Sequence, residues 1–432
     1  MSRIAVVGAG YVGLTTAVGF AALGHEVLGA DVDADRVARL NKGQVPILEE
    51  GMDELLRQGF ESNRLKFVVG AAEAARQSEF VYLCVPTPQG DDGSADLSYV
   101  EAVAREIAPV LEPGTIVVNK STMPVGSSRF VARILAEAGA LDGVGVASNP
   151  EFLREGFAVR DFMSPSRIVI GADDSAVAVR VSELFKGIQA PMIITDPASA
   201  ELIKYASNTF LATKISFINA IANLCEQVDA DVREVALGMG YDSRIGFEFL
   251  HPGPGYGGSC FPKDTAALLH TARRNGYDFS LLAGVIEVNH AQHERMVDKV
   301  RRAAGGSLEG IPVAVWGLTF KANTDDLRDS PAVVIVRRLV EEGARVVAFD
   351  PAAEPAVVSN LLPEITLASD AYEAADGARV LVLLTEWDQF RWLDHARVQA
   401  AMESPSVVDT RNLLDPAAMR RLGFDYEGVG RS

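Results

Sequence analysis

The sequence has 432 residues, of which 48% are hydrophobic and 23% are charged. These proportions are typical of a folded globular protein, and the length exceeds that of one ordinary core, so we expect two or three domains. The formal net charge of −18 argues against binding to nucleic acid or to an anionic membrane surface, because both need basic patches.

The start of the chain and its cysteines favour a cytoplasmic location. The segment Arg3–Val7 resembles the first strand of a domain and lacks the features of an export signal. No run of about 20 apolar residues occurs without charges or glycine turns, so we expect no membrane span. The three cysteines, Cys84, Cys225 and Cys260, do not suggest a disulfide framework.

Apolar strand-like runs alternate with helical patterns through the first part of the chain. This alternation is typical of a parallel sheet built from βαβ units. The expected strands are Ile4 to Val7, Glu26 to Ala30, Leu65 to Val69, Phe80 to Val85, Thr115 to Asn119 and Val144 to Ser148.

A long helix is expected to begin at Pro197, because some thirty residues follow without another proline or any glycine. Its apolar positions recur at three-and-four spacing, which favours a core helix packed along its whole length. These positions are Ala206, Phe210, Thr213, Phe217, Ala220, Leu224 and Val228.

The alternation of strands and helices restarts near Gly310, which indicates a second doubly wound domain. Its expected elements are strands at Pro312 to Trp316, Arg345 to Asp350, Val380 to Leu384 and Val407 to Thr410, and a helix at Pro331 to Glu342. We therefore predict an α/β fold with two Rossmann-like domains joined by a long central helix. The predicted domains are 1–196 for dinucleotide binding, 197–300 for a central helical region, and 301–432 for the second Rossmann-like domain.

A G-x-G-x-x-G motif, with glycines at Gly8, Gly10 and Gly13, directly follows the first strand and opens a helix. In this context the first glycine permits a tight turn, the second lets the backbone approach a pyrophosphate, and the third brings helix and strand together. The helix N-terminus then offers N–H groups to the phosphates. The motif predicts a dinucleotide site.

Asp31 follows the next strand, about twenty residues beyond the loop, where a carboxylate accepts the ribose hydroxyls of NAD. A 2′-phosphate would meet like charge there, so we expect NAD and not NADP. Arg36 is the counter-argument, because an arginine can hold that phosphate, but two aspartates lie beside it.

Cys260 lies between a glycine pair and a helix expected to run from Pro262 to Arg274. The helix N-terminus and Lys263 would favour the thiolate, and Asp264 could act as a base or orient water. Cys84, within an apolar strand, and Cys225, on the long helix, fit small buried hydrophobic residues instead.

A nucleophilic cysteine together with a nicotinamide cofactor predicts one particular chemistry. An aldehyde gives up hydride readily only after a nucleophile adds to its carbonyl, and a thiolate adduct then becomes a thioester that water hydrolyses. A first hydride transfer would form that aldehyde from an alcohol.

With these motifs the chain resembles the UDP-glucose/GDP-mannose dehydrogenase family, and most closely its UDP-glucose 6-dehydrogenases, over essentially its whole length. The segments that carry the resemblance are residues 8–13, 121–126, 149–156, 201–208, 258–264 and 320–328. The resemblance implies an NAD-binding domain, a central helical region, a UDP-binding domain, UDP-glucose as substrate, and a homodimer or higher homo-oligomer.

The resemblance also implies the role of individual residues. The nucleophile would be Cys260, the oxyanion would be stabilised by Lys204 and Asn208, and water would be oriented or activated by Asp264, Glu151 and Thr122. Residues near the cofactor would be Gly8, Gly10, Tyr11, Val12, Gly13, Asp31, Arg36, Thr87, Thr122, Glu151, Lys263 and Arg328. Residues near the substrate would be Glu151, Phe152, Leu153, Arg154, Glu155, Lys204, Asn208, Phe249, Leu250, His251, Pro252, Gly253, Gly257 and Lys321, with Arg244 reaching the substrate of a neighbouring subunit.

The residue types themselves leave duller interpretations open. Lys204 and Asn208 share one helix face by their spacing of four, but Lys204 could be a solvated lysine at a helix edge. Glu151 could be a helix-capping acid. His290 and His293 are three apart, yet no third ligand accompanies them and an Asn-His helix start is typical of a surface, so no metal is predicted.

Three other functions compete with this interpretation. A family member acting on GDP-mannose or a UDP-N-acetyl sugar would share the motifs. A two-electron hydroxyacid dehydrogenase would share the first domain but would not need Cys260. A non-catalytic nucleotide-sugar sensor predicts loss of Cys260, Lys204 or Asp264, and all three are present.

Overall fold

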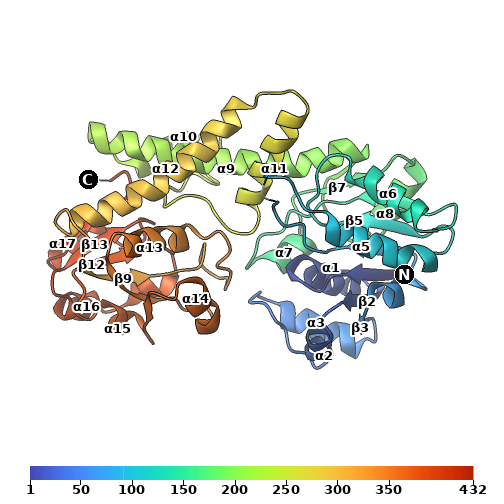
Figure 1. The fold of residues 1–432 in the computed structure, drawn as a ribbon, viewed down its shortest axis with the longest axis horizontal. Helices are drawn as coiled ribbons and strands as arrows, with labels where there is room; N and C mark the ends of the chain where they lie inside the picture. The colour runs from blue at the N-terminus through green and yellow to red at the C-terminus, as the bar shows by residue number, and fades with distance from the viewer. Residues whose placement is uncertain (91, 432) are drawn as a thin grey trace. The chain divides into compact units, whose positions relative to one another are not determined.

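The protein is described by a computed structural model that covers residues 1–90 and 92–431 (Figure 1). The chain forms two compact units. Unit 1 comprises Met1–Ser207 and Ala266–Tyr277, and unit 2 comprises Asn208–Thr265 and Asp278–Ser432.

Unit 1 is built on an eight-stranded sheet with the order β3-β2-β1-β4-β5-β6-β7-β8. Neighbouring strands are parallel except β6 and β7, which pair antiparallel. The strands are β1 (Arg3–Val7), β2 (Glu26–Asp31), β3 (Leu65–Val69), β4 (Phe80–Leu83), β5 (Ile116–Asn119), β6 (Gly145–Ser148), β7 (Ile168–Gly171) and β8 (Met192–Thr195).

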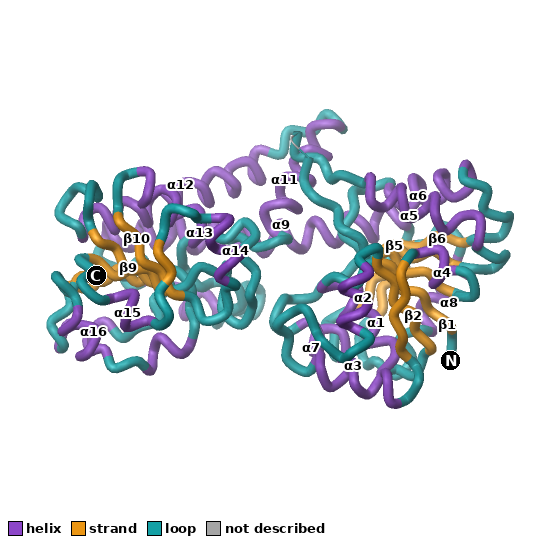
Figure 2. Tube along the Cα trace, turned by 60° about the horizontal axis from the view of Figure 1, so that its bottom comes forward, coloured by secondary structure: helices purple, strands orange, loops and turns teal. Residues whose placement is uncertain are grey.

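Both faces of this sheet are buried, as a parallel sheet requires. Along β1, Ile4 and Val6 belong to one apolar core, while Ala5 and Val7 belong to the other. Figure 2 shows the strands of each sheet with helices around them. The helices of unit 1 are α1 (Tyr11–Ala22), α2 (Ala34–Leu40), α3 (Met52–Glu61), α4 (Ala71–Ala75), α5 (Ser98–Ile107), the 3-10 turn Ala108–Val110, α6 (Ser127–Glu137), α7 (Ala158–Met163) and α8 (Ser175–Glu183).

Unit 2 contains a six-stranded sheet with the order β11-β10-β9-β12-β13-β14, in which all neighbours are parallel. This order repeats the plan of the first six strands of unit 1. The strands are β9 (Pro312–Trp316), β10 (Arg345–Phe349), β11 (Thr366–Leu367), β12 (Val380–Leu383), β13 (Ser406–Asp409) and β14 (Asp425–Glu427). The helices are α10 (Val232–Gly240), α12 (Ser280–Ala303), α13 (Pro331–Glu341), α14 (Pro355–Leu361), α15 (Ala371–Ala375), the 3-10 turn Asp388–Trp392, α16 (His395–Ala401) and α17 (Pro416–Arg421).

Two helices contribute residues to both units. The 32-residue helix α9 (Pro197–Val228) passes from unit 1 to unit 2 after Ser207. Helix α11 (Phe261–Arg274) passes from unit 2 to unit 1 after Thr265. The predicted fold, with two Rossmann-like sheets and a long helix that begins at Pro197, is confirmed.

The prediction that the apolar stripe of α9 forms a packed core seam is wrong. Phe210 is 65% exposed and Val228 is 61% exposed, and Phe217 and Leu224 are exposed by about half. Ala206 and Ala220 are exposed as well, and Thr213 is half-buried. The core of unit 2 instead takes Ile218, Ala222 and Cys225 from another face of the helix. Helical spacing therefore identified an apolar face of α9, but this face lies outside the core.

The ten predicted strands are present, and their ends differ from the predicted ones by at most two residues. Strands β7, β8, β11 and β14 were not predicted. Within residues 1–90 and 92–431, no helix is both long and apolar enough to cross a membrane.

Candidate active site

The G-x-G-x-x-G loop has the geometry that its sequence predicts. Gly8 has a φ of +95°, and a Cβ there would lie 2.6 Å from the Cys84 carbonyl oxygen. A Cβ on Gly13 would lie 1.7 Å from the Gly8 carbonyl oxygen, so this glycine lets α1 approach the turn. Gly10 has open space where a side chain would be. No side chain caps the N-terminus of α1, which leaves N–H groups for a phosphate. The loop therefore fits a dinucleotide pyrophosphate.

Asp31, at the end of β2, is fixed beside this loop. Its Oδ2 accepts a 2.8 Å hydrogen bond from the Ala9 backbone and lies 3.2 Å from Nη1 of Arg36. The carboxylate is buried, while the Arg36 side chain is 41% exposed. Arg36 is therefore bound by an acid, which opposes its use for a 2′-phosphate.

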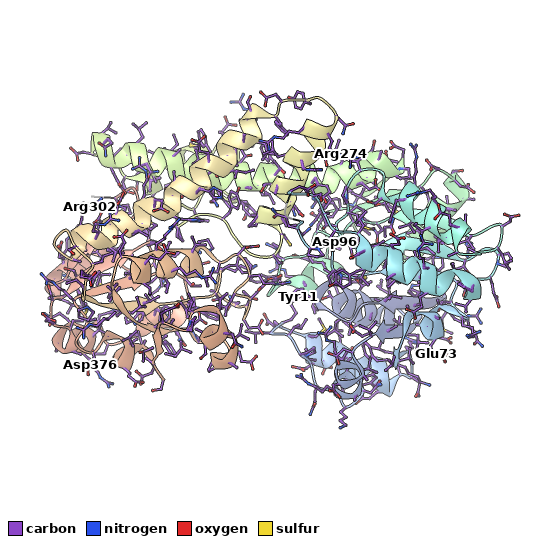
Figure 3. The ribbon with its side chains drawn as sticks, viewed as in Figure 1. Tyr11, Glu73, Asp96, Arg274, Arg302 and Asp376 are labelled. Atoms are coloured by element: carbon purple, nitrogen blue, oxygen red, sulfur yellow. The ribbon has the colours of Figure 1, made fainter. Side chains whose placement is uncertain are left out.

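Tyr11, the first residue of α1 (Figure 3), links the loop to two other segments. Its hydroxyl donates to Glu49 and accepts from the Gly156 backbone. The other oxygen of Glu49 accepts from the Val159 backbone. Burial, followed by Glu49, raises the pKa of Tyr11 well above its ordinary value, so the hydroxyl keeps its proton. The sequence interpretation did not include Glu49.

Thr87 and Thr122, two further predicted site residues, are joined directly. The Thr87 hydroxyl donates a 2.8 Å hydrogen bond to the Thr122 carbonyl, and both residues are buried. Thr87 follows β4 and Thr122 follows β5. The strand order reverses between β1 and β4, and a doubly wound sheet binds its dinucleotide at this point, so Thr87 follows a strand that borders it and Thr122 follows the next strand.

Glu151 and Lys204 form a buried ion pair. The Lys204 Nζ lies 2.8 Å from Glu151 Oε1, and both side chains are 5% exposed or less. Glu151 Oε2 accepts a 2.6 Å hydrogen bond from the Leu153 backbone. Burial opposes ionisation of Glu151, but Lys204 lowers the pKa of the carboxyl below its usual value overall. Lys204 is thus not a solvated lysine, and Glu151 does not cap a helix.

A second buried lysine, which the sequence interpretation missed, lies in the same region. Lys120 directly follows β5, is 5% exposed, and donates a 3.1 Å hydrogen bond to Oδ1 of Asn149. Asn149 in turn donates to the Val169 carbonyl. The sequence signal that could have identified Lys120 is a charged residue directly after a strand expected to be buried.

Cys260 directly precedes α11, as predicted. Its carbonyl accepts a 2.8 Å hydrogen bond from the Asp264 backbone, the first such bond of the helix. Its sulfur lies 3.5 Å from the Ser259 hydroxyl, and the residue is partly exposed. Cys84 and Cys225 are buried, and burial raises the pKa of Cys84 to about 12. Of the three cysteines, Cys260 has the position of a nucleophile.

Asp264 lies at the centre of a polar cluster within unit 2. Its side chain is fully buried, and Oδ2 accepts a 2.6 Å hydrogen bond from the Asn208 carboxamide. Its Oδ1 lies 2.8 Å from Nζ of Lys263. Asn208 is on α9, one helical turn after Lys204. The structure therefore brings Asn208, Lys263 and Asp264 together, whereas the family resemblance implied only that Lys263 lies near the cofactor.

The segment before Cys260 packs against the loop that follows β9. A Cβ on Gly257 would lie 2.2 Å from the Asp329 carbonyl oxygen, and one on Gly258 would lie 2.7 Å from the Phe320 ring. The same loop carries Lys321, whose ammonium lies 5.3 Å from the Phe320 ring, and Arg328, which pairs with Asp326. These two predicted residues therefore share a loop that contacts the segment leading to the cysteine.

Buried amides hold the preceding loop, residues 253–256. Asn219 accepts from the Gly253 backbone and Gln292 donates to its carbonyl, both at 2.8 Å. Asn289 accepts from the Tyr256 backbone at 2.8 Å and donates to its carbonyl at 3.1 Å. Sequence reasoning missed these amides, because isolated Asn and Gln residues on helices carry no motif.

Other predicted substrate residues have the following positions. Phe249 has a positive φ of 64°, Leu250 and Pro252 are buried, and His251 is exposed. The guanidinium of Arg167 lies 3.6 Å from the Phe152 ring centre. Arg154 pairs with Asp161, and Glu155 is half-buried. Arg244 pairs with Asp242 and its side chain is 87% exposed.

His293 is buried, so the prediction that it lies at the surface is wrong. Asn289 and His290 lie within α12 and not at a helix start. Burial lowers the pKa of His293 to about 4, so its ring is neutral near neutral pH. Among the described residues, no three His, Cys, Asp or Glu side chains are placed to hold a metal ion.

Profiles of three domains match the chain in order. They are described as the NAD binding domain, the central domain and the UDP binding domain of the UDP-glucose/GDP-mannose dehydrogenase family. They match residues 2–189, 198–291 and 314–416.

Similar proteins match over the full length. The UDP-glucose 6-dehydrogenase of Rhizobium meliloti is 47% identical over 99% of both chains, and that of Pseudomonas aeruginosa is 44% identical over 99% of this chain and 97% of the relative. The structure of a UDP-glucose dehydrogenase from Pyrobaculum islandicum has a TM-score of 0.93 and 40% identity, covering 100% of this chain and 98% of the other. A UDP-D-ManNAc dehydrogenase from Pyrococcus horikoshii has a TM-score of 0.90 and 28% identity, with 99% of both chains covered. The chain therefore belongs to the UDP-glucose/GDP-mannose dehydrogenase family.

Proposed function

We propose that the protein is an NAD-dependent UDP-glucose 6-dehydrogenase, which oxidises the primary alcohol of the sugar to a carboxylate. One observation carries the reaction type. Within a chain that has a dinucleotide loop, Cys260 directly precedes a helix whose first turn carries Asp264, the acceptor of the buried hydrogen bond from Asn208. The choice of sugar rests on full-length relatives named UDP-glucose 6-dehydrogenase at 40 to 47% identity.

The residues present fit NAD. The open space at Gly10 and the uncapped start of α1 suit the pyrophosphate, and the buried Asp31 suits a ribose without a 2′-phosphate. When bound, NAD supplies the hydride acceptor. Thr87 and Thr122 lie at the strand ends where the nicotinamide half binds in such sheets.

In this mechanism Cys260 acts on the aldehyde formed by the first oxidation. The alcohol loses a hydride and a proton to give that aldehyde, and the thiolate then adds to its carbonyl carbon. The resulting thiohemiacetal is an oxyanion, which loses a second hydride and becomes a thioester. Lys204 and Asn208 stabilise the oxyanion, since both are buried donors on α9.

Hydrolysis of the thioester completes the reaction. Water attacks the acyl carbon, the carbon–sulfur bond breaks, and Cys260 leaves as thiolate. Asp264 and Glu151, both buried carboxylates with hydrogen-bonded partners, orient the water and accept its proton. One UDP-glucose, two NAD and one water thus yield UDP-glucuronate, two NADH and three protons.

We assign the substrate to the segment that precedes Cys260 and to the loop that follows β9. Phe249 to Gly253 and Gly257 would contact the sugar and uridine largely through backbone groups, and Lys321 would contact the sugar or diphosphate. The buried amides described above support this assignment, because they fix the backbone of the loop at Gly253 and Tyr256.

We further propose that the enzyme is a homodimer in which a second copy covers the exposed face of α9. Phe210, Phe217 and Leu224 recur every seven residues on this face and are all exposed. A self-complementary stripe of this kind suits a two-fold interface. Arg244, exposed in the same unit, would then reach the substrate of the partner.

The test counts NADH formed from limiting UDP-glucose with excess NAD, for the wild type and for Cys260→Ser. We expect about two NADH per sugar, and failure of the variant to release UDP-glucuronate. One NADH per sugar would contradict the thioester route. Oxidation of a UDP-N-acetyl sugar or GDP-mannose in place of UDP-glucose would instead favour the second candidate function, a dehydrogenase of the same family with another nucleotide sugar as substrate. The TM-score of 0.90 to a UDP-D-ManNAc dehydrogenase supports this candidate.

A further inference from the structure

Lys120 is a buried lysine of unit 1 for which the mechanism above has no use. Its Nζ donates to Asn149, whose backbone N–H is bonded to the carbonyl of Asn119 at the end of β5. Asn149 lies two residues before Glu151. Lys120 is therefore anchored at the base of the segment that carries the Glu151 carboxylate.

The charged groups that face Glu151 come from several elements. Lys204 of α9 bonds it directly, Lys120 follows β5, and Arg167 precedes β7. Burial opposes the ionised form, whereas Lys204, the hydrogen bond from the Leu153 backbone and Lys120, in that order, lower the pKa of the Glu151 carboxyl. Cys84 also interacts electrostatically with Lys120 and Glu151, but it keeps its proton because burial raises its pKa to about 12.

Lys120 is charged under ordinary conditions despite its burial. Burial lowers the pKa of its ammonium to about 8, so the ammonium form prevails at and below neutral pH. The two buried lysines then bring two positive charges to one carboxylate charge, and the half-buried Arg167, stacked on the Phe152 ring, adds a third. Positive charge therefore remains to balance an oxyanion.

We propose that Lys120 is a positioning residue that keeps Glu151 ionised while Lys204 turns its hydrogen bond to the reacting carbonyl. This inference rests on the proposed function. Lys204 alone cannot neutralise both Glu151 and an oxyanion in a buried site, and a lone buried carboxylate would take up a proton. A protonated Glu151 could not accept the proton of the water that attacks the thioester.

The test follows thioester hydrolysis as a function of pH in Lys120→Gln, which can still donate to Asn149 but carries no charge. Single turnovers are quenched, and the acyl adduct on Cys260 is quantified by mass spectrometry. We expect the pH at which adduct decay falls to half its maximal rate to lie about one unit higher in the variant than in the wild type, because loss of one nearby charge raises a carboxyl pKa by about one unit. Decay should then be about tenfold slower than in the wild type at pH values below both inflections, and nearly equal to it near pH 8.

Two further variants complete the comparison. Lys120→Arg keeps the charge and should retain the wild-type pH profile. Lys299→Gln removes another buried lysine, which pairs with Glu226 and Glu427, and should leave the profile unchanged. Thermal unfolding of each variant checks that it is folded, and if Lys120→Gln is not, Lys120→Met takes its place.

Equal slowing of Lys120→Gln at every pH, or none at all, would overturn the role of Lys120. Absence of any adduct and of a second NADH in the wild type would overturn the proposed function itself. The two failures are therefore distinguishable in one set of experiments.

Discussion

The carboxamide of Asn208 donates a 2.6 Å hydrogen bond to Asp264, so α9 and the first turn of α11 are joined beside Cys260. The other oxygen of Asp264 is held by Lys263, and the carboxylate is completely buried. A buried carboxylate with both oxygens engaged has a fixed orientation, which a group that positions water requires.

Replacing Asp264 by Asn should therefore lower kcat by about 10²-fold to 10⁴-fold, because the neutral side chain can no longer accept a proton. The KM for UDP-glucose should change by only a few-fold. Steady-state rates of NADH formation measure both quantities. Asp415→Asn, a change at the N-cap of α17 that both residue types tolerate, is the matched control and should leave kcat unaltered.

The Lys204–Glu151 pair makes a prediction about stability. Lys204→Met should lower the free energy of unfolding by about 3 to 5 kcal/mol, because it leaves a buried carboxylate without its partner. The double variant Lys204→Met, Glu151→Gln should recover much of this loss. Urea unfolding near pH 7 measures the change, and a double variant no more stable than the single one would contradict it.

The pH dependence of stability follows from the same carboxyl. The pKa of Glu151 is lowered in the folded state, so its ionised form favours folding at pH values above the unfolded pKa of about 4.5. This contribution is lost as the pH falls through the lower, folded value. In urea unfolding from about pH 6 downward, the wild type should therefore lose more stability than Glu151→Gln. Parallel curves for the two proteins would show that the pair does not stabilise the fold.

Asp31 makes a prediction about the cofactor. Asp31→Ser should remove the charge that repels a 2′-phosphate and release Arg36 from its 3.2 Å ion pair. We expect kcat/KM for NADP relative to NAD to rise at least about tenfold, which corresponds to roughly 1.4 kcal/mol in cofactor preference. Initial rates with each cofactor measure the ratio. Asp174→Ser, at the N-cap of α8, is the control and should preserve the preference for NAD.

The buried amides that hold the loop of residues 253–256 make a prediction about the substrate. Gln292→Ala removes a buried donor to the Gly253 carbonyl, and Asn289→Ala removes both hydrogen bonds to Tyr256. Each change should raise the KM for UDP-glucose more than it lowers kcat, because the loop that we assign to the nucleotide sugar loses its fixed backbone. The KM for NAD should stay near the wild-type value, and an equal rise in both constants would argue for a general structural effect.

The parts of the fold that follow from local pattern could be predicted. The alternation of buried strands and the spacing of Gly8, Gly10 and Gly13 depend on neighbours in sequence, so both sheets and the dinucleotide loop were recognisable. The edge strands β8 and β14 were not, because their apolar content is low or exposed: Ile194 in β8 is 52% exposed. A strand at an edge needs less apolar surface than a central one.

The candidate site could be predicted where residues belong to a motif, and not where tertiary contacts give them their surroundings. Cys260 and Asp264 belong to one short segment. Lys120 and His293 are polar residues whose burial depends on strands and helices distant in sequence. The stripe of α9 shows the same limit, since spacing identifies an apolar face but not whether it meets the core or another molecule.

That stripe leads to the last prediction, which concerns assembly. Phe217→Glu places a charge in the middle of the exposed face of α9, and a charge in an apolar interface is costly unless it is paired. We expect the wild type to be a dimer or a higher oligomer by light scattering, and the variant to dissociate toward monomer at the same concentration. Tyr277→Glu changes an aromatic residue of similar exposure, 60%, outside α9 and α10, and should leave the mass unchanged.

Because Arg244 is assigned to the partner's substrate, the dissociated Phe217→Glu protein should also lose activity. Mixing inactive Arg244→Ala with inactive Cys260→Ser should restore activity, since mixed dimers contain one site with both an intact cysteine and an intact arginine. Failure of the mixture to gain activity, with exchange of subunits verified, would show that each site is complete within one chain.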